Sequence, residues 1–352
     1  MIRFFYGGIV LVFGLTGCKP HPAPPTNSPV EQPPAKPERW FQFPTDNRFL
    51  LQANAEDQFF TPTTTARPWS SGSFGCVRNS GTRLHEGIDI LSIKRDENEE
   101  PIDSVRAAAA GSIVHINHNT AASNYGKYVV VAHEVDGLPF YTLYAHLRSV
   151  HAELKTGQDV AGGDELGVLG RTTNYSEGIA SWRAHLHFEI GLQINSRFNG
   201  WFKHWYRDGK NLHGPWNGLN LLGLDAAEIL RQDHAGQFEM VPYISALPVL
   251  CRVRVHRSKL DWLDRFTELI GENPAVADDP DAWDLDLSFS GIPIRATPVR
   301  DPKLRKTAKY EILSVDADVR RKHPCSGLVF PKGQQWVFTS KGQRHMDLLI
   351  FR

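Results

Sequence analysis

Apolar and polar residues alternate from residue 184 to residue 190, and this alternation predicts a β-strand with two distinct faces. Successive side chains of a strand point to opposite sides, so each face collects every second residue. One face is apolar and consists of Leu186, Phe188 and Ile190. The other face consists of His185, His187 and Glu189. We therefore expect the first face to pack into a core and the second to carry a chemical site.

Short apolar runs separated by turn residues precede this segment and predict further strands. They cover residues 105–109, 112–116, 128–132, 140–144 and 166–169. Glycine marks the breaks between them, as in Asp136-Gly137 and Gly162-Gly163. The pattern predicts a compact antiparallel β unit, so the expected fold class is mainly β.

Beyond residue 225 the chain contains both helix-like and strand-like segments, which predicts an α+β region. We expect one helix over residues 225–234 and another over about 258–270, with Ser258 and Asp261 as its capping pair. Strand-like runs follow at residues 285–289, 310–315, 336–339 and 348–351. Residues 225–352 show no catalytic pattern, and their role stays open.

The first residues predict an export signal that is not part of the fold. Arg3 precedes an apolar run over residues 4–15, which is too short to span a bilayer stably. The run ends in Leu15-Thr16-Gly17-Cys18, which resembles the lipobox of bacterial lipoproteins. Residues 1–18 are thus expected to be a signal peptide ending at a lipidated Cys18, which would anchor the chain to a membrane. The alternative is a plain signal peptide with a chance cysteine.

Residues 19–39 are rich in proline and almost free of apolar side chains, so they predict an extended linker. At roughly 3.1 Å per residue in polyproline II geometry, the linker would reach on the order of 60 Å. Folded sequence is expected to begin near Trp40.

Length and composition fit two folded units, with 352 residues of which 41% are hydrophobic. Lys and Arg number 39, and Asp and Glu also number 39. Because the formal charges balance, no net field attracts nucleic acid, and we expect no nucleic-acid partner.

His85 and Asp89 offer two donors of the types that zinc binds. A catalytic zinc site needs three protein ligands whose donor atoms lie within ~4 Å of one another. On a straight strand these two side chains would lie ~13 Å apart, so the chain must bend between them, and Gly87 permits a bend. His187 is the expected third ligand, arriving from a different strand.

Four ordered segments resemble peptidase family M23, the LytM or lysostaphin type of zinc metallopeptidase. The segment His85-Glu86-Gly87-Ile88-Asp89 resembles the family's H-x-x-x-D motif, and His185-Leu186-His187 resembles its H-x-H motif. Residues 125–131 resemble the strand before the family's hairpin, and residues 143–147 resemble its Y-x-H-L segment. The resemblance spans about residues 74–192, and it implies an M23-like zinc peptidase domain over residues 40–224.

Carried over to this sequence, the resemblance implies one Zn²⁺ per chain, held by His85, Asp89 and His187. It makes His146 and His185 the catalytic pair that handles protons and stabilises the oxyanion. Zinc would lower the pKa of a water to about 7 and polarise the scissile carbonyl. One imidazole would take the water proton, and the pair would return a proton to the leaving amine.

Other ionisable residues near the motifs have less certain roles. The H-E-x-x-H pattern of helical zinc peptidases fails because residue 89 is Asp, so Glu86 is expected to be a bystander. Glu189 is expected either to orient an imidazole or to have a structural role. The remaining histidines of this half are expected to be ordinary packed or exposed residues, namely His115, His118, His133 and His151.

Two aromatic segments border the expected site. Residues 174–183 form a longer loop than the short Gly/Ser/Thr-rich turn typical of the family, and this loop contains Tyr175 and Trp182. A second group is expected to pack around the edge of the β unit, or alternatively to form a lip that stacks on sugar or peptide. It consists of Trp201, Phe202, Trp205, Tyr206 and Trp216.

The cysteines predict one disulfide. With Cys18 lipidated, three thiols remain in an oxidising envelope, and we expect Cys251 to pair with Cys325. Cys76 would then be a buried, inert thiol or, alternatively, a thiolate that binds the zinc as a latch.

The resemblance implies a zinc endopeptidase that hydrolyses peptide bonds in bacterial cell-wall peptidoglycan, either in stem-peptide cross-links or in bridges. One alternative is a non-catalytic lipoprotein that binds and activates a cell-wall amidase, and another is a protease of envelope proteins. The complete set of motif residues favours the enzyme. The expected location is the cell envelope, anchored by lipid, with the outer membrane facing the periplasm favoured because Lys19 follows Cys18. Residues 225–352 would be a packing partner, a wall-binding module or a regulatory flap.

Overall fold

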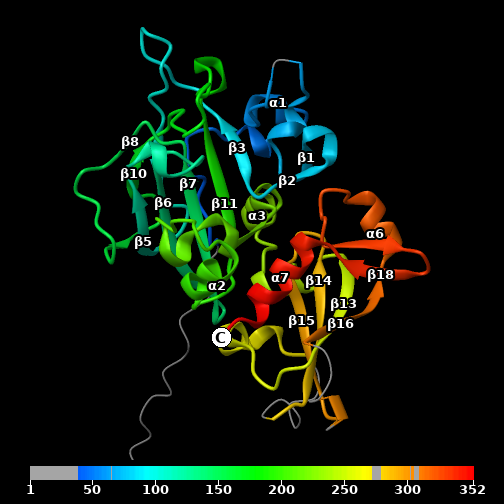
Figure 1. Cartoon of the computed structure of the whole chain (residues 1–352). Coiled ribbons are helices and arrows are strands. Elements are labelled where there is room, and N and C mark those ends of the chain that lie inside the picture. Colours follow the sequence, from blue (N-terminus) through cyan, green and yellow to red (C-terminus); the bar gives the residue numbers. More distant parts are fainter. Residues whose placement is uncertain (1–38, 65, 272–278, 302, 305–308) are drawn as a thin grey trace, which may run out of the picture. The chain divides into compact units, whose positions relative to one another are not determined.

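An antiparallel sheet centred on β11 (His185–Gln193) organises the first half of the structure (Figure 1). Strand β7 pairs with one edge of β11, and β3 and β12 share the other edge. In the described part of the chain this sheet has seven strands, in the order β12-β11-β7-β6-β5-β9 with β3 beside β11. The further bounds are β3 (Ile88–Leu91), β5 (Gly111–Asn117), β6 (Tyr128–Val135), β7 (Leu138–Ala145), β9 (Asp159–Val160) and β12 (Leu221–Leu224).

This computed structural model describes residues 39–352 apart from 65, 272–278, 302 and 305–308. The expected signal peptide, its Cys18 and the linker up to residue 38 lie outside the described residues. Glu38–Arg352 form one compact unit. Among the described residues, no helix is both long and apolar enough to cross a membrane.

The two faces of β11 pack as the alternation predicts. The side chains of Leu186, Phe188 and Ile190 are fully buried in the main core. Glu189 on the opposite face accepts a hydrogen bond from the Tyr141 hydroxyl. Tyr141 belongs to a second, smaller apolar cluster with Tyr128, Val130, Leu143, Ala145 and Leu221. The histidine face of β11 therefore lies on the side of this smaller cluster.

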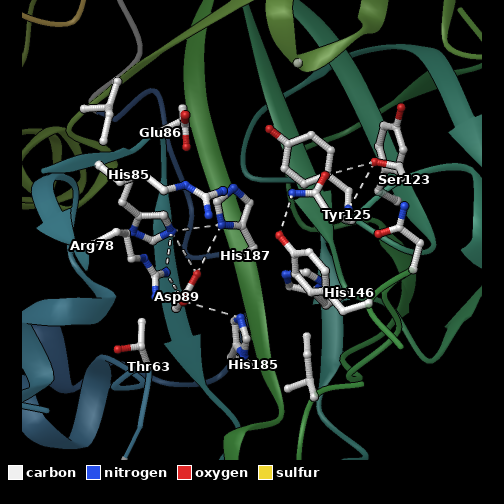
Figure 2. Close-up of a pocket in the computed structure, with 18 of the residues that line it drawn as sticks. Thr63, Arg78, His85, Glu86, Asp89, Ser123, Tyr125, His146, His185 and His187 are labelled. Carbon is white, nitrogen blue, oxygen red and sulfur yellow. Dashed lines mark hydrogen bonds and ion pairs between the residues drawn. The ribbon is translucent and has the colours of Figure 1, made fainter. Parts of the chain in front are cut away.

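The sheet register places two of the expected ligands opposite each other, because His187 of β11 pairs with Asp89 of β3 (Figure 2). His85 ends β2 (Arg83–His85), and the chain bends at Glu86 and Gly87 before β3 begins, as expected. The glycine is required by space, since a Cβ at Gly87 would lie 2.4 Å from the carbonyl oxygen of Phe188.

Two smaller sheets border the main one. β1 (Gly75–Arg78) pairs with β2 (Arg83–His85), and β10 (Glu165–Val168) lies between β4 (Ser104–Arg106) and β8 (Ser149–Val150). All of the strands expected in this half are present, with shifted ends. The antiparallel, mainly β fold class is confirmed.

Helices are few in this half. α1 (Glu56–Phe59) is a single turn, and α2 (Phe198–Trp205) follows β11. Trp201 and Phe202 of α2 are buried in the main core, which confirms for them the packing role expected of the aromatic group.

The second half is an α+β region, as predicted. Its four-stranded antiparallel sheet has the order β15-β14-β13-β16. The strands are β13 (Val249–Val255), β14 (Ala282–Ser288), β15 (Pro293–Val299) and β16 (Tyr310–Val315), with a separate hairpin of β17 (Val329–Lys332) and β18 (Gln335–Phe338). The helices are α3 (Ala226–His234), α4 (Met240–Ser245), α6 (Ala317–Lys322) and α7 (Ser340–Ile350). The helix expected at residues 225–234 is confirmed, with Asp225 as its N-cap.

Two expectations for this half are wrong. Residues 258–270 form two short 3-10 turns instead of a helix, η8 (Asp261–Asp264) and η9 (Thr267–Leu269). The adjacent Trp262 and Leu263 are both buried, so the segment does not present the single apolar face of an amphipathic helix. Residues 348–350 belong to the end of α7 instead of a strand. A short apolar run fits either element, and here the cap at Thr339 starts a helix.

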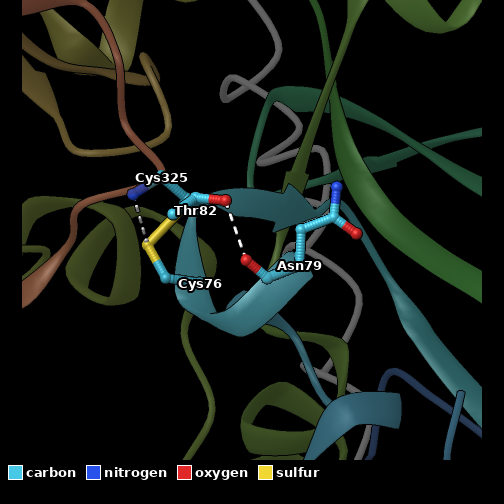
Figure 3. The surroundings of a disulfide bond; sticks show 4 residues. All are labelled: Cys76, Asn79, Thr82 and Cys325. Carbon is cyan, nitrogen blue, oxygen red and sulfur yellow. Dashed lines mark hydrogen bonds between the residues drawn. A yellow bond between two sulfur atoms is a disulfide. The ribbon is translucent and has the colours of Figure 1, made fainter.

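The expected disulfide between Cys251 and Cys325 is also wrong. The structure pairs Cys76 of β1 with Cys325 (Figure 3). Cys251 is a free, buried thiol. Cys251 lies on β13, a central strand flanked by β14 and β16, where its side chain is packed in the core. Cys76 is therefore neither a free thiol nor a zinc latch. A cross-link closing a loop of this length stabilises a fold by about 5 kcal/mol in the chain-entropy model.

Both halves share one hydrophobic core. The buried cluster that contains Phe188 of β11 continues through Val253 of β13 and Leu285 of β14 to Leu349 of α7. Such continuity favours a packing role for residues 225–352.

Candidate metal centre

Three donor atoms from three strands converge in this structure. His85 Nε2 lies 3.1 Å from Asp89 Oδ1 and 3.1 Å from His187 Nδ1, and the last two atoms are also 3.1 Å apart. Among the described residues, these three form a group whose donor atoms lie close enough together to hold one metal ion. All three residues are buried. Donor atoms ~2.0–2.2 Å from one ion in tetrahedral geometry would lie at about this spacing. The two imidazoles and the carboxylate therefore fit a zinc ion.

Hydrogen bonds fix which ring nitrogen of each candidate ligand faces the centre. His85 Nδ1 lies 2.7 Å from the carbonyl oxygen of Ser73, to which only an N–H can donate, so the lone pair of the ring is on Nε2, where it accepts a hydrogen bond from Arg78. His187 Nε2 lies 2.8 Å from Glu189 Oε1, which leaves Nδ1 toward Asp89. A metal-ligating histidine commonly has its second nitrogen held in this way.

Glu189 is the residue that orients His187, one of the two roles expected for it. Its carboxylate is fully buried and also accepts hydrogen bonds of 2.6 Å from the hydroxyls of Tyr125 and Tyr141. Burial would raise the pKa of Glu189, but the hydrogen bond from His187 and those from the two tyrosines lower it. Glu189 is therefore an ionised acceptor held in place on three sides.

His187 and Asp89 carry opposite charges when no metal is bound. Burial opposes protonation of His187, but hydrogen bonds to Asp89 and Glu189 raise its pKa to about 9. Burial would raise the pKa of Asp89, but His185, Arg78 and His85 hold it well below its usual range. A cation of higher charge can therefore replace a proton at His187 Nδ1.

His185 and His146 lie beside the three candidate ligands. His185 Nδ1 is 2.5 Å from the carbonyl oxygen of Arg183, and His146 Nδ1 is 2.8 Å from that of Thr172, so both rings keep Nε2 free. The ring centroids are 4.8 Å apart, and His185 Nε2 is 3.4 Å from Asp89 Oδ2. Burial lowers the pKa of His185 to about 4 and lowers that of His146 well below its usual value. Both imidazoles are neutral proton acceptors.

His146 reaches the centre through an unusual backbone conformation. It follows β7 directly and has a φ of 62°, in the left-handed region that non-glycine residues seldom adopt. Its backbone N–H donates to the carbonyl oxygen of Tyr125 at 2.9 Å, which holds the turn. Strained residues of this kind concentrate at functional sites.

Arg78 is a site residue that the sequence did not suggest. Its Nη2 lies 2.5 Å from Asp89 Oδ2 and 2.8 Å from His85 Nε2, and Figure 2 shows it beside both side chains. Asp89 thus uses Oδ1 toward the two ligand imidazoles and Oδ2 toward Arg78 and His185. A basic residue in the strand that pairs with the His85 strand was the available signal.

A cleft of about 790 Å³ opens over the centre. Its lining includes Asn174, Tyr175, Gly178, Ile179 and Arg183, so the loop over residues 174–183 borders the site as expected. Tyr175 is 52% exposed, and Asn124 donates a hydrogen bond to its hydroxyl. The described lining residues all fall between residues 63 and 219, so the second half of the chain contributes none of them.

The other residues weighed from the sequence lie outside the metal-ligand group. Glu86 lines the cleft but is not a member of that group. His133 is packed, with Nδ1 donating to the Ala110 carbonyl and Nε2 facing the hydroxyl of Thr142. His115, His118 and His151 are likewise not members of the group.

Comparison with known proteins identifies the domain that holds these residues. Residues 83–199 match the model of peptidase family M23, a span that contains all five of the expected site residues. No curated protein sequence matches the chain.

Several solved structures are similar to part of the chain. A protein described as a glycyl-glycine endopeptidase lytM from Ruminococcus gnavus is 28% identical over 33% of this chain and 42% of its own, with a TM-score of 0.26. The catalytic domain of lysostaphin from Staphylococcus simulans is 23% identical over 38% of this chain and 75% of its own, with a TM-score of 0.24. A zinc-containing peptidase from Vibrio cholerae is 24% identical over 38% of this chain and 36% of its own, with a TM-score of 0.25. The chain thus spans less than half of the first and third of these proteins.

Proposed function

Starting from a chain that carries a peptidase family M23 domain over residues 83–199, we propose that it is a zinc-dependent endopeptidase of bacterial cell-wall peptidoglycan. The observation that carries the proposal is the convergence of His85 Nε2, Asp89 Oδ1 and His187 Nδ1 in a buried group at the floor of an open cleft. Non-catalytic relatives would be expected to lack such a set, and here the set is complete.

The proposed roles follow from the free nitrogen of each ring. His85, Asp89 and His187 would hold the ion, which when bound would supply Lewis acidity and lower the pKa of a water to about 7. His185 Nε2, next to Asp89, takes a proton from the attacking water. His185 then returns this proton to the leaving amine, and His146, which lies opposite His185, would donate a hydrogen bond to the developing oxyanion once its Nε2 is protonated.

The proposed setting is the cell envelope. The sequence of residues 1–18 predicts lipid attachment at Cys18, and residues 19–39 predict an extended spacer. In this proposal the anchored enzyme extends from a membrane, with the outer membrane favoured, toward peptidoglycan. Stem-peptide cross-links and bridges are both candidate substrates.

The test is to incubate the full zinc-loaded chain with purified peptidoglycan and measure newly released amino termini. We expect release to stop when the metal is chelated and to return when zinc is added. His118→Ala serves as the control, because His118 is exposed and outside the metal-ligand group.

Other results would support the alternatives. If peptidoglycan gains no amino termini while a denatured protein is cleaved, the chain is a protease of proteins. If neither substrate is cleaved and a separate amidase becomes more active when the chain is added, the chain is a non-catalytic activator of that amidase.

A further inference from the structure

One end of the cleft is cationic, and most of its positively charged side chains have no role in the proposed chemistry. Arg78, Arg83 and Arg183 all line the cleft. Arg78 and Arg83 are direct partners across the β1–β2 pair, where like charges destabilise each other. Arg183 comes from the loop before β11. Burial lowers its pKa, the charge of Asp89 opposes this, and the like charge of Arg78 adds a smaller lowering.

Arg183 is under-paired for its position. It is half-buried, and its Nε donates to the carbonyl oxygen of Pro62 at 3.1 Å. A guanidinium has five N–H donors, and within the described residues its two Nη atoms have no hydrogen-bond acceptor. The acid that acts electrostatically on Arg183 is Asp89, which is already engaged by Arg78 through Oδ2 and by the ligand imidazoles through Oδ1. A half-buried cation without its own carboxylate is costly unless a ligand provides one.

The opposite end of the cleft differs in character. It is lined by Ser123, Asn124, Tyr125 and Tyr175, which are uncharged. Glu86 also lines the cleft, and its charge adds to burial and to Glu189 in raising the pKa of Tyr125, so the acid acts on this end. Figure 2 shows Arg78 and Thr63 on one side of β11 and Ser123 and Tyr125 on the other. A peptide lying across the centre would therefore have one side next to the arginines and the other next to neutral hydroxyls and amides.

We propose that Arg183 binds a free carboxylate of the substrate peptide close to the bond that is cut. The planar fork of a guanidinium matches a carboxylate with two parallel hydrogen bonds. The inference rests on the proposed function and narrows its substrate class to acidic peptides. It selects stem peptides with free carboxylates over neutral glycine bridges.

The test compares two synthetic cross-linked stem peptides that differ only in the carboxylate next to the scissile bond, one free and one amidated. With the zinc-loaded wild-type chain, amidation should lower kcat/KM about 10- to 100-fold, the size of one charge-assisted interaction. Arg183→Gln should cut the free acid about as slowly as the wild type cuts the amide, and should cut the amide at an almost unchanged rate. Arg183→Lys should keep part of the preference.

The matched control is Arg207→Gln, because Arg207 is an exposed arginine outside the cleft. It should show the full wild-type preference for the free acid. If the wild type cuts both peptides equally, or if Arg183→Gln slows both equally, the carboxylate site is wrong while the peptidase proposal stands.

Binding separates failure of this inference from failure of the proposed function. Titration of the His185→Ala chain with the two peptides measures affinity without cleavage. Tighter binding of the free acid, together with no cleavage by the wild type, would retain the carboxylate site and overturn the peptidase. Equal or absent binding of the two peptides, together with no cleavage, would overturn both.

Discussion

Two strands of this molecule carry ionisable side chains at alternate positions, and the two rows are completed in different ways. On β13, Arg252 and Arg254 face Asp286 and Asp284 of β14, and each pair makes two hydrogen bonds of 2.7 and 2.8 Å. Every charge in that row has its own partner. Such a row needs nothing from outside the chain.

The row on β11 is not self-sufficient. His185 and His187 are both buried, and each has one nitrogen fixed by an oxygen acceptor and the other directed toward Asp89. His85 Nε2 and His187 Nδ1 each lie 3.1 Å from the same carboxylate oxygen, Asp89 Oδ1. The difference teaches that burial and alternation do not by themselves mark a functional row, whereas the convergence of several metal-type donor atoms on one point does.

The largest effect is expected when one of the three proposed metal ligands is removed. His187→Ala should reduce bound zinc from about one ion per chain to almost none, a loss larger than the 10- to 100-fold typical of an outer partner. Metal content measured after dialysis checks this. Zinc retained at the wild-type level would show that His187 is not a ligand.

Removing the neighbouring imidazole should leave the metal in place. His185→Ala is expected to retain zinc and to lose about 10²- to 10⁴-fold in kcat, because a positioned general base is missing. Kinetics on peptidoglycan peptides, together with metal analysis of the same sample, separate the two effects. Equal zinc loss in His185→Ala and His187→Ala would contradict the division of roles.

The carboxylate behind His187 should have an intermediate effect. Glu189→Gln keeps the shape but weakens the hydrogen bond to His187 Nε2, so zinc affinity should fall about 10- to 100-fold. Competition with a chelator of known affinity measures this fall. Tyr141→Phe, which removes one hydrogen bond to Glu189, should have a smaller effect in the same direction.

Zinc uptake should also release a proton. The pKa of His187 is about 9 in the metal-free protein, so at pH 7 its ring carries two protons, and the proton at Nδ1 must leave when the metal binds. Calorimetry in two buffers of different ionisation enthalpy should give about one proton per zinc at pH 7, falling toward zero as the pH rises above 9. The same raised pKa means that metal-free stability contributed by His187 is present below pH ~6.5 and is lost as the pH rises through about 9.

The smallest effect is expected in the paired row. Arg252→Ala should lower the free energy of unfolding by about 1 kcal/mol, because Arg252 is half-exposed while Asp286 loses its partner. Chemical denaturation measures this loss. Zinc content should not change, and a change would mean that the two rows are coupled.

Periodicity and motif spacing predict β11 and the candidate ligands, but they do not predict the residues that surround these ligands. The alternation at residues 184–190 predicts both faces of β11, and the bend at Gly87 follows from strand geometry. Arg78 was missed because its approach to Asp89 depends on how β1 lies against β3, which no local pattern encodes. The cysteine pairing failed for the same reason, since Cys251 and Cys325 are nearer in sequence but Cys76 is nearer in space. The under-paired state of Arg183 is visible only once its neighbours are known.

The bond between Cys76 and Cys325 has a consequence for how this protein withstands cleavage. It closes a covalent ring that contains His85, Asp89, His146, His185 and His187. A single cut anywhere inside that ring leaves the two pieces joined, so the piece with His85 and the piece with His187 do not separate. A nicked chain would therefore migrate as one band without reductant and as two with it, and it would keep its donor atoms together for as long as the bond stays oxidised.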